Sequence, residues 1–271
     1  MIKQAIIPLA GLGTRLLPLT SVFAKELLPI NGRPGIEYIL DECIEAGIKE
    51  IVFIISTKKK MIKKYFYSDQ FYKNIIKKKK DPRIINEYKK ILKYKSKIKF
   101  VFQNIPKGTG DAVLKTQKYI KNKYFLMLLP DDLIIKKNCS KSMIKVHKKY
   151  QASVMASMKI KKNNVSRWGI YKIKKKLNKR NYVIEGVVEK PSVKKAPSNN
   201  AVIGRYILPR TIFKKIKSLN PGKGKEIHIT DAIQLLINDK EKFVAHNFEG
   251  KYLDCGTMSG YVYSSTEMRK I

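Results

Sequence analysis

The stretch KQAIIPLAGLGTR, from Lys3 to Arg15, decides the fold. Its first part, Lys3 to Ala10, is apolar enough for a buried strand, and its second part, Gly11-Leu12-Gly13-Thr14-Arg15, is a glycine-rich loop. In α/β proteins, a glycine-rich turn after the first strand presents backbone N–H groups to phosphates. The stretch therefore predicts an α/β fold with a phosphate-binding loop.

Strand and helix signals alternate through the first half of the chain, which is typical of a parallel sheet with crossover helices. Gly35 to Ala46, for example, carries apolar residues at helical spacing and is closed by Gly47. Residues 58–97 are rich in Lys and Tyr and are expected to be helical in pieces. The other expected strands are 51–56, 99–103, 124–130 and 152–160, and the other expected helices are 111–119 and 140–150, with Ser140 as the N-cap.

The alternation changes after residue 160. Residues 168–173, 182–190 and 202–208 look like strands without long helices between them, which favours antiparallel pairing. Two helices, 210–217 and 229–237, then precede a strand at 242–247 and a short final helix. Because no internal repeat and no linker rich in Pro, Gly or Ser is present, the simplest description is one α/β domain with a β-rich substrate-binding half.

The glycine-rich loop fits one kind of phosphate ligand better than two others. A P-loop would need a lysine and a spacing that are absent, and a dinucleotide fingerprint would need a third glycine where Leu16 stands. Arg15 in the loop and Lys25 ten residues later suit a triphosphate, because a guanidinium can fork terminal phosphates while a lysine neutralises charge near the reacting phosphorus. The alternative is an ordinary surface turn with two of many basic residues.

The charge of the chain invites a nucleic-acid interpretation. The sequence has 58 Lys+Arg against 21 Asp+Glu, a formal charge of +37, and such a balance is typical of proteins that bind phosphate backbones. Only eight of the basic residues are arginine, however, and phosphate and base recognition favours the planar arginine fork. Lysines scattered along the expected helices favour a solvated surface, so no specific nucleic-acid partner is expected.

Several function and location classes are excluded by simple patterns. No run of 18 apolar residues occurs, so no membrane partner is expected. The amino terminus enters a strand-like run at once and offers no signal peptide, which predicts a cytoplasmic protein. Cys43, Cys139 and Cys255 are odd in number and far apart, with only three His beside them, so neither disulfides nor structural zinc are expected.

Two consecutive motifs resemble a known family. Gly11-Leu12-Gly13-Thr14-Arg15 followed by Lys25-Glu26-Leu27-Leu28-Pro29 resembles the signature of the sugar-phosphate nucleotidyltransferases. Ala24 departs from it, because the family usually places Pro before the lysine, and the chain stops soon after its last motif, without the tail of longer relatives. An ordered series of stretches resembles the bacterial UTP:glucose-1-phosphate uridylyltransferase branch: AIIPLAGLGTRLLPLT, AKELLPI, YILDECIEAGIKEIVFI, KGTGDAVL, LPDDLI, VVEKP, VIGRYIL, EIHITDAI and DCGTMSGY.

The resemblance implies a fold and an activity. The fold is a single Rossmann-like, glycosyltransferase-A-like domain over residues 1–271, with a central mixed, mostly parallel sheet, a nucleotide-binding half (1–135) and a β-rich sugar-phosphate-binding half (136–271). The activity is Mg²⁺-dependent transfer of the uridylyl group of UTP to α-D-glucose 1-phosphate, giving UDP-glucose and pyrophosphate, in a homo-oligomer. The alternatives are another nucleotide or sugar phosphate, such as dTTP, or a non-catalytic regulatory paralogue.

A metal site is expected at Asp131, which directly follows the apolar strand 124–130, where α/β folds place ligand residues. Mg²⁺ needs one or two carboxylates and takes its other ligands from phosphates and water. The resemblance puts the metal-binding aspartates at Asp131 and Asp254. The alternative roles are a turn aspartate for Asp131 and a helix-capping aspartate for Asp254.

The resemblance also assigns substrate contacts. Gln103 with the backbone at Gly108 would recognise uracil from a floor made by the turn 107–110, although thymine offers the same edge. Glu189 would hold sugar hydroxyls, Lys190 the sugar phosphate, and the backbone near Gly169 the hexose. The implied catalytic residues are Arg15, Lys25, Asp131 and Lys190, and the other implied nucleotide contacts are Ala10, Gly11, Gly13, Thr14 and Glu26.

Overall fold

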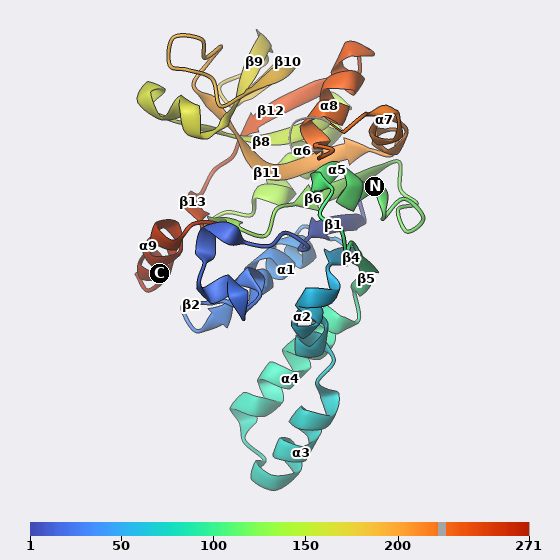
Figure 1. Cartoon of the computed structure of the whole chain (residues 1–271), viewed down its shortest axis with the longest axis vertical. Coiled ribbons are helices and arrows are strands. Elements are labelled where there is room, and N and C mark those ends of the chain that lie inside the picture. The colour runs from blue at the N-terminus through green and yellow to red at the C-terminus, as the bar shows by residue number, and fades with distance from the viewer. Residues whose placement is uncertain (222–225, 271) are drawn as a thin grey trace.

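The first strand, β1, lies inside a nine-stranded mixed sheet of order β5-β4-β1-β6-β11-β8-β12-β10-β9 (Figure 1). The computed structural model describes residues 1–221 and 226–270, so residues 222–225 and 271 of the expected domain lie outside the described residues. In chain order the strands are β1 (Gln4–Pro8), β4 (Glu50–Ile55), β5 (Ile98–Phe102), β6 (Tyr124–Leu128), β8 (Ser153–Lys159), β9 (Gly169–Lys176), β10 (Asn181–Glu189), β11 (Asn200–Pro209) and β12 (Phe243–Asn247).

Parallel and antiparallel pairs occupy different parts of this sheet. Strands β5, β4, β1 and β6 pair in parallel, as the alternation of the first half predicts. Strand β11 runs antiparallel to both β6 and β8, and β9, β10 and β12 continue with antiparallel pairs, so β8–β12 is the parallel exception. The mixed sheet is confirmed, but the parallel pairs dominate its first half only, because the second half lacks long crossover helices.

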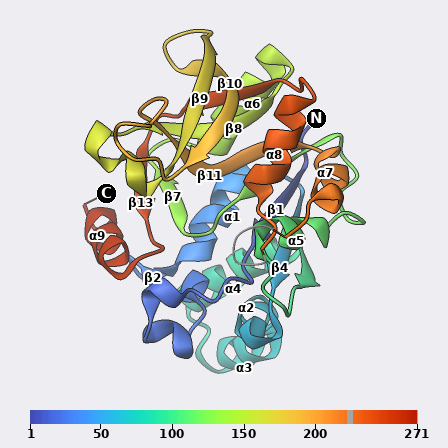
Figure 2. The same cartoon turned by 45° about the horizontal axis from the view of Figure 1, so that its top comes forward.

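Helices cover both faces of the sheet, and its central strands are buried on both sides. Alternate residues of β1 point to opposite faces, so Ile7 belongs to one hydrophobic core and Ile6 to the other. Helices α1 and α6 pack on the first core, and Figure 2 shows α5, α7 and α8 together over the second. These helices are α1 (Gly35–Glu45), α5 (Gly108–Leu114), α6 (Cys139–Tyr150), α7 (Ile212–Ser218) and α8 (Ile229–Asn238).

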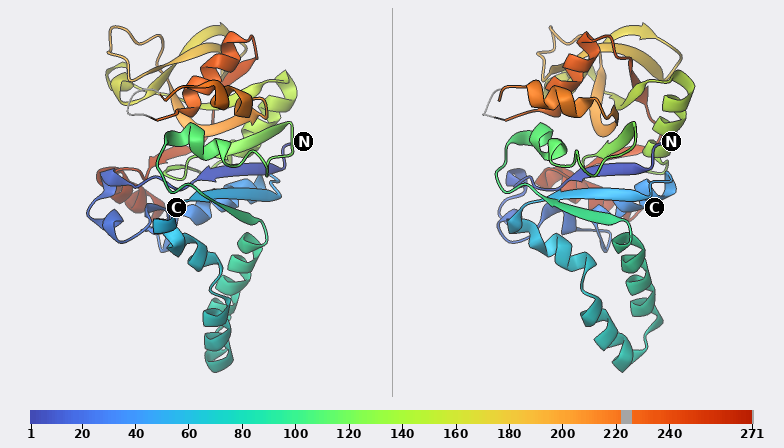
Figure 3. Two further views of the ribbon diagram at one scale, coloured as in Figure 1. Left: turned by 45° about the vertical axis from the view of Figure 1, so that its right-hand side comes forward. Right: turned by 90° about the vertical axis from the view of Figure 1, so that its right-hand side faces the viewer.

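The Lys-rich segment expected to be helical in pieces forms three helices, α2 (Lys60–Phe66), α3 (Asp69–Lys79) and α4 (Pro82–Lys95). Helices α3 and α4 form an arm that projects from the body (Figure 3). Asp81 caps α4 through the backbone N–H of Arg83, and the stacked rings of Tyr72 and Tyr88 join the two helices. These contacts hold α3 and α4 against each other.

Four short strands and the last helix lie outside the nine-stranded sheet. Strands β7 (Asp132–Ile135) and β13 (Lys251–Asp254) pair antiparallel, with Asp132 opposite Asp254. A small hairpin, β2 (Pro29–Ile30) and β3 (Arg33–Pro34), precedes α1, and α9 (Met258–Met268) closes the chain. Strand β7 was not expected from the sequence, and its pairing brings the carboxy-terminal segment beside the residue that follows β6.

Two helix starts differ from the expectation. The helix expected at 111–119 begins at Gly108, so the expected turn 107–110 is mostly the first turn of α5. Asn138, not Ser140, caps α6: its side chain accepts the N–H of Lys141, while Ser140 lies inside the helix and is fully buried. Ser140 is held there by a tertiary hydrogen bond to Glu42, which no local pattern reveals.

Among the described residues, no helix combines the length and the apolar character needed to cross a bilayer. The three cysteines, Cys43, Cys139 and Cys255, are free and buried.

Candidate active site

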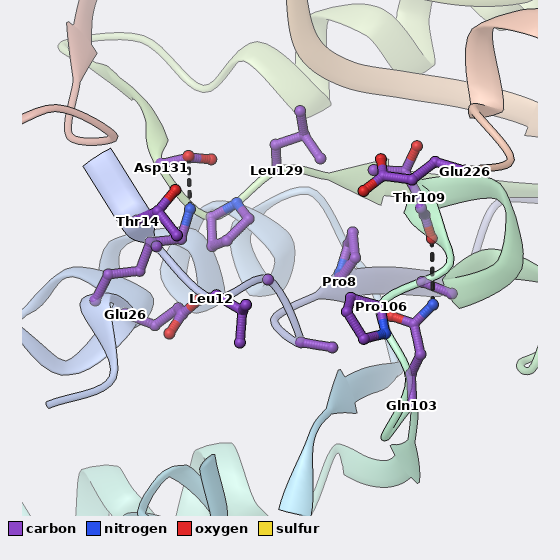
Figure 4. A pocket seen from close by; sticks show the side chains of 17 residues that line it. Pro8, Leu12, Thr14, Glu26, Gln103, Pro106, Thr109, Leu129, Asp131 and Glu226 are labelled. Carbon is purple, nitrogen blue, oxygen red and sulfur yellow. Dashed lines mark hydrogen bonds and ion pairs between the residues drawn. The ribbon is translucent and has the colours of Figure 1, made fainter. Parts of the chain in front are cut away.

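A cavity of about 470 Å³ opens where β1, β5 and β6 end (Figure 4). The glycine-rich loop forms one wall, and the segments after β5 and β6 form others. Lys25 and Asp131 of the expected catalytic set line it as well. All the residues expected to contact nucleotide also line it: Ala10, Gly11, Gly13, Thr14, Glu26, Gln103 and Gly108.

Lys25, Arg15 and Asp131 form a charged cluster at this cavity. Oδ2 of Asp131 lies 2.7 Å from Nζ of Lys25 and 3.5 Å from Nη2 of Arg15, and Figure 4 shows Asp131 facing the glycine-rich loop. Burial would raise the pKa of Asp131, but the charges of Lys25 and Arg15 hold that pKa below its ordinary value. Burial would lower the pKa of Lys25, but Asp131 and Glu26 raise it overall. The carboxylate and the ammonium are therefore both charged at neutral pH.

Asp254 lies at the same cluster. A β-carbon added to Gly256 would stand 2.8 Å from Oδ2 of Asp131, 2.9 Å from Nη2 of Arg15 and 3.2 Å from Oδ1 of Asp254, so these three groups surround one point. The backbone N–H of Cys255 donates to the carbonyl of Asp131 at 2.8 Å, which fixes the two segments together. The β7–β13 pair thus brings together two carboxylates that are far apart in sequence.

The two carboxylates fit a hard divalent cation. Mg²⁺ takes one or two protein carboxylates and completes its shell with phosphate oxygens and water, whereas a zinc site would need three or four protein ligands. No cluster of three or more His, Cys, Asp or Glu side chains arranged for a metal occurs among the described residues. The donor set at Asp131 and Asp254 therefore fits a metal that arrives with phosphates.

The glycine-rich loop owes its shape to Gly13 and Thr20. Gly13 has φ +72°, a left-handed backbone that favours glycine, and the Thr20 hydroxyl donates to its carbonyl at 2.8 Å. Leu16 is fully buried and anchors the loop to the core. Thr20 was missed by the sequence reasoning, because a hydroxyl seven residues from its acceptor has no recognisable spacing.

Glu26 lines the cavity, but its carboxylate is already engaged. Both carboxylate oxygens accept from Nζ of Lys59, at 2.8 and 2.9 Å, and the same Nζ donates to the carbonyl of Leu9 at 2.8 Å. Burial lowers the pKa of Lys59, and the charge of Glu26 opposes this. The pair therefore fixes the start of the glycine-rich loop. Lys59 was missed because it lies in the run Lys58-Lys59-Lys60, which looks like surface.

Gln103 has a fixed orientation at the opposite end of the cavity (Figure 4). Its Nε2 donates to Oδ2 of Asp111 at 2.7 Å and to the carbonyl of Gly108 at 3.2 Å. Because a carboxylate at Asp111 accepts only, the amide nitrogen must face it. Gly108 has φ +90°, and a β-carbon there would lie 2.5 Å from the carbonyl oxygen of Ile227. Both residues are thus rigidly placed.

Gly169, Glu189 and Lys190 lie outside the residues that line the cavity. Gly169 and Glu189 pair across β9 and β10, and a β-carbon on Gly169 would lie 3.0 Å from Oε2 of Glu189. Lys190 has φ +45°, and its backbone N–H donates to the carbonyl of Trp168 at 3.0 Å. The structure thus groups these three residues with one another.

Strand β11 connects this second group to the cavity. The same β-carbon on Gly169 would lie 3.4 Å from Val202, and a β-carbon on Gly204 would lie 2.6 Å from Cβ of Leu129. Val202 and Gly204 are two residues apart on one strand, which corresponds to roughly 7 Å. The expected sugar-phosphate residues therefore lie two residues of β11 further along than the cavity wall formed by Leu129 and Asp131.

A family model and two relatives of known name match nearly the whole chain. The family model described as Nucleotidyl transferase matches residues 4–270. A putative UTP–glucose-1-phosphate uridylyltransferase of Methanocaldococcus jannaschii is 36% identical over 99% of this chain and 93% of the relative. A UTP–glucose-1-phosphate uridylyltransferase of Streptococcus pyogenes is 36% identical over 98% of this chain and 88% of the relative.

A solved structure gives the same result for the fold. A UDP-glucose pyrophosphorylase complexed with UDP-glucose superposes with a TM-score of 0.86 at 35% identity, covering 100% of this chain and 99% of the other. The family model and both relatives extend over nearly the whole chain. The glycine-rich loop, the charged cluster around Asp131 and these full-length matches together show that the chain belongs to the nucleotidyl transferase family.

Proposed function

We propose that this chain transfers the uridylyl group of UTP to α-D-glucose 1-phosphate, giving UDP-glucose and pyrophosphate. A phosphate oxygen of the sugar phosphate attacks the α-phosphorus of UTP in line and pyrophosphate leaves. The observation that carries the proposal is the convergence of Lys25, Arg15 and Asp131 at the glycine-rich loop. The names of the full-length relatives support the choice of substrates.

The basic residues make the meeting of two anions favourable. Negative charge grows on the attacking, equatorial and leaving oxygens, so positioning and neutralisation supply most of the catalysis. Lys25, which is mostly buried, neutralises charge near the reacting phosphorus. Arg15, whose side chain is 65% exposed, reaches the terminal phosphates from the rim. Neither role needs a covalent enzyme intermediate.

Members of this family generally use a divalent metal. We infer that Mg²⁺ is that metal here and that Asp131 and Asp254 hold it. When bound, it supplies positive charge to the phosphate oxygens. Asp131 also orients the ammonium of Lys25, and Asp254 accepts the backbone N–H of Gly256, which keeps the turn beside the cluster closed.

Gln103 and Gly108 select the base. With Nε2 of Gln103 committed to Asp111, its Oε1 accepts the N3–H of uracil, and the backbone of Gly108 contacts the rest of the base edge. Beyond β11, Glu189 holds sugar hydroxyls, Lys190 the sugar phosphate, and the Gly169 backbone the hexose. Residues 1–135 then form the nucleotide-binding half and residues 136–271 the sugar-phosphate-binding half.

A nucleotide panel with radiolabelled glucose 1-phosphate and Mg²⁺ tests this function. Labelled UDP-glucose should form rapidly with UTP, and pyrophosphate should appear in equal amount. Equal use of UTP and dTTP would contradict the choice of UTP as the substrate, because thymine presents the same edge to Gln103 as uracil does. A failure to turn over any nucleotide would instead favour a non-catalytic regulatory paralogue, and tight, steeply salt-dependent duplex binding would favour a nucleic-acid protein.

We also infer that the enzyme is a cytoplasmic homo-oligomer. The three free thiols fit a reducing compartment. Large apolar side chains at Leu17, Val22 and Phe23 are more than half exposed, which is typical of contact surfaces. Light scattering of the purified protein measures the oligomeric state, and a monomer at micromolar concentration would contradict that inference.

A further inference from the structure

A buried ion pair lies behind the cavity wall, between Arg205 on β11 and Glu42 on α1. Arg205 is fully buried, and 7% of Glu42 is exposed. Nε of Arg205 donates to both oxygens of Glu42, at 3.1 and 3.2 Å, and Nη2 donates to Oε2 at 2.9 Å. Neither residue lines the cavity, so the pair cannot touch a ligand there.

Two further donors of Arg205 hold the backbone on either side of Asp131, while Nη1 also donates to the carbonyl of Gly204 at 3.2 Å. Nη2 donates to the carbonyl of Asp132 at 2.6 Å, and Nη1 donates to the carbonyl of Leu129 at 3.0 Å. These two carbonyls flank the Pro130-Asp131 dipeptide. A lysine could not replace this arrangement, because its single ammonium lacks the planar fork that spans both carbonyls and a carboxylate.

Glu42 connects the same point to α6. The backbone N–H and the hydroxyl of Ser140 donate to Oε1 of Glu42, at 3.0 and 2.5 Å. Asn138, the N-cap of α6, donates from Nδ2 to the carbonyl of Glu42 at 3.0 Å. One ion pair thus ties α1, α6 and β11 to the segment that carries Asp131.

Stability alone gives no reason for such a pair. Removing two charges from water costs about as much as their attraction returns, and apolar residues of similar volume often stabilise a core at least as well. Its distinguishing property is geometric, because one guanidinium binds the Glu42 carboxylate and three backbone carbonyls, two of which flank Pro130-Asp131.

We propose that the Glu42–Arg205 pair is the positioning device of Asp131: it fixes the carbonyls of Leu129 and Asp132 and thereby holds the Asp131 carboxylate against Lys25 and Asp254. The proposal rests on the function proposed above for Asp131. Arg205 and Glu42 are positioning residues, because they act through the 129–132 backbone and contact no substrate.

Hydrogen exchange of the metal-free protein without substrate tests the positioning directly. In Arg205→Lys, amides of the segment 129–134 should exchange about tenfold faster or more, while those of α7 and α8 keep their rates. Leu236→Ala, in the buried face of α8, is the matched control: it lowers the melting temperature by removing core contacts but should leave exchange in 129–134 unchanged.

Metal binding supplies a second measurement. Mn²⁺ titrated in the presence of a non-hydrolysable UTP analogue should bind Arg205→Lys about 10- to 100-fold more weakly, the usual effect of losing a group that orients a metal ligand. Activity of this variant should recover at high metal concentration. If Arg205→Lys does not fold, the double variant Glu42→Leu/Arg205→Met, which keeps the volume without charge, should fold and show the same two changes.

The outcomes separate this proposal from the proposed function. Wild-type exchange in 129–134 together with wild-type Mn²⁺ affinity, in whichever of the two variants folds, would overturn the positioning role. Asp131→Asn in the same assays reports on the function itself: full activity there would overturn the role of Asp131 whatever Arg205 does. An inactive Asp131→Asn beside an unaffected Arg205→Lys would overturn the positioning proposal alone.

Discussion

Nζ of Lys25 lies 2.7 Å from Oδ2 of Asp131, although 106 positions of sequence separate the two residues. Lys25 follows the glycine-rich loop, and Asp131 follows the central strand β6, so the contact joins two elements that each end at the same edge of the sheet. In the proposed reaction these two groups have different partners, the triphosphate for Lys25 and the metal for Asp131. In that reaction their contact would mark the place where phosphates and metal meet.

Removing the ammonium of Lys25 should impair catalysis far more than folding. We expect Lys25→Ala to lower kcat/KM for UTP at least about 10²-fold, as loss of one donor aimed at transition-state charge usually does. Circular dichroism should show an unchanged fold. Lys99→Ala is the control, because Lys99 pairs with Glu50 in an exposed position away from the cavity. If both variants keep wild-type activity, Lys25 has no catalytic role.

Asp254 can be tested separately from Asp131. We expect Asp254→Asn to raise the Mg²⁺ concentration needed for half-maximal activity about tenfold or more, because one of two carboxylates is replaced by a weaker ligand. Activity should be partly restored at high Mg²⁺. Asp239→Asn, an exposed aspartate paired with Lys215, serves as the control. An unchanged Mg²⁺ dependence in Asp254→Asn would show that Asp254 does not bind the metal.

Much of the candidate site could be proposed from the sequence because its central parts are local. The glycine-rich loop, Lys25 and Asp131 each belong to a short motif or a strand end, and the family was confirmed by the full-length matches. Most elements expected in the first half were confirmed to within a few residues, although the helix expected at 111–119 runs from Gly108 to Leu114 and β7 was not expected. These residues can be identified from the sequence because the loop and the strand end each occupy only a few consecutive positions.

The supporting contacts could not be predicted in the same way. Lys59, Thr20 and Arg205 act on residues 7 to 163 positions away, so their roles depend on the tertiary fold alone. Lys59 looks like any lysine of a basic surface, and Arg205 looks like framework within Gly204-Arg205-Tyr206. Thr20 and Arg205 belong to stretches that resemble the family, but no local pattern shows what their side chains contact.

Lys59 should be essential for stability only while Glu26 is charged. We expect Lys59→Met to destabilise the protein by about 3–5 kcal/mol, because it leaves the Glu26 carboxylate buried without a counter-charge. The double variant Glu26→Gln/Lys59→Met should regain most of this loss, since no charge remains buried. Urea denaturation of the two variants measures the difference. Equal destabilisation in both would show that the ion pair is not the cause.

His246 should make the free energy of unfolding depend on pH in the acidic range. Burial lowers the pKa of His246 to about 4, and the charge of Arg180 acts in the same direction. Because the unfolded chain takes up this proton near pH 6.5 and the folded protein does not, the stabilisation is complete above pH 6.5 and is lost as pH falls towards 4. The loss is about 3 kcal/mol at most. His246→Asn should flatten this part of a stability–pH curve, and an unchanged slope would refute the assignment.

Two glycines with the same backbone strain allow a controlled test of the base site. Gly108 has φ +90° and Gly47 has φ +85°, but a β-carbon on Gly108 would lie 2.5 Å from the Ile227 carbonyl oxygen, whereas one on Gly47 would meet nothing within 4 Å. Both Gly→Ala variants should therefore lose about 1 kcal/mol from strain. Gly108→Ala must in addition displace the first turn of α5, whose carbonyl at residue 108 holds the amide of Gln103.

We expect KM for UTP to rise about tenfold or more in Gly108→Ala and to stay unchanged in Gly47→Ala. Because the strain is matched, a rise confined to Gly108→Ala reports on the placement of Gln103 rather than on stability. Equal KM values in the two variants would mean that α5 does not position the base.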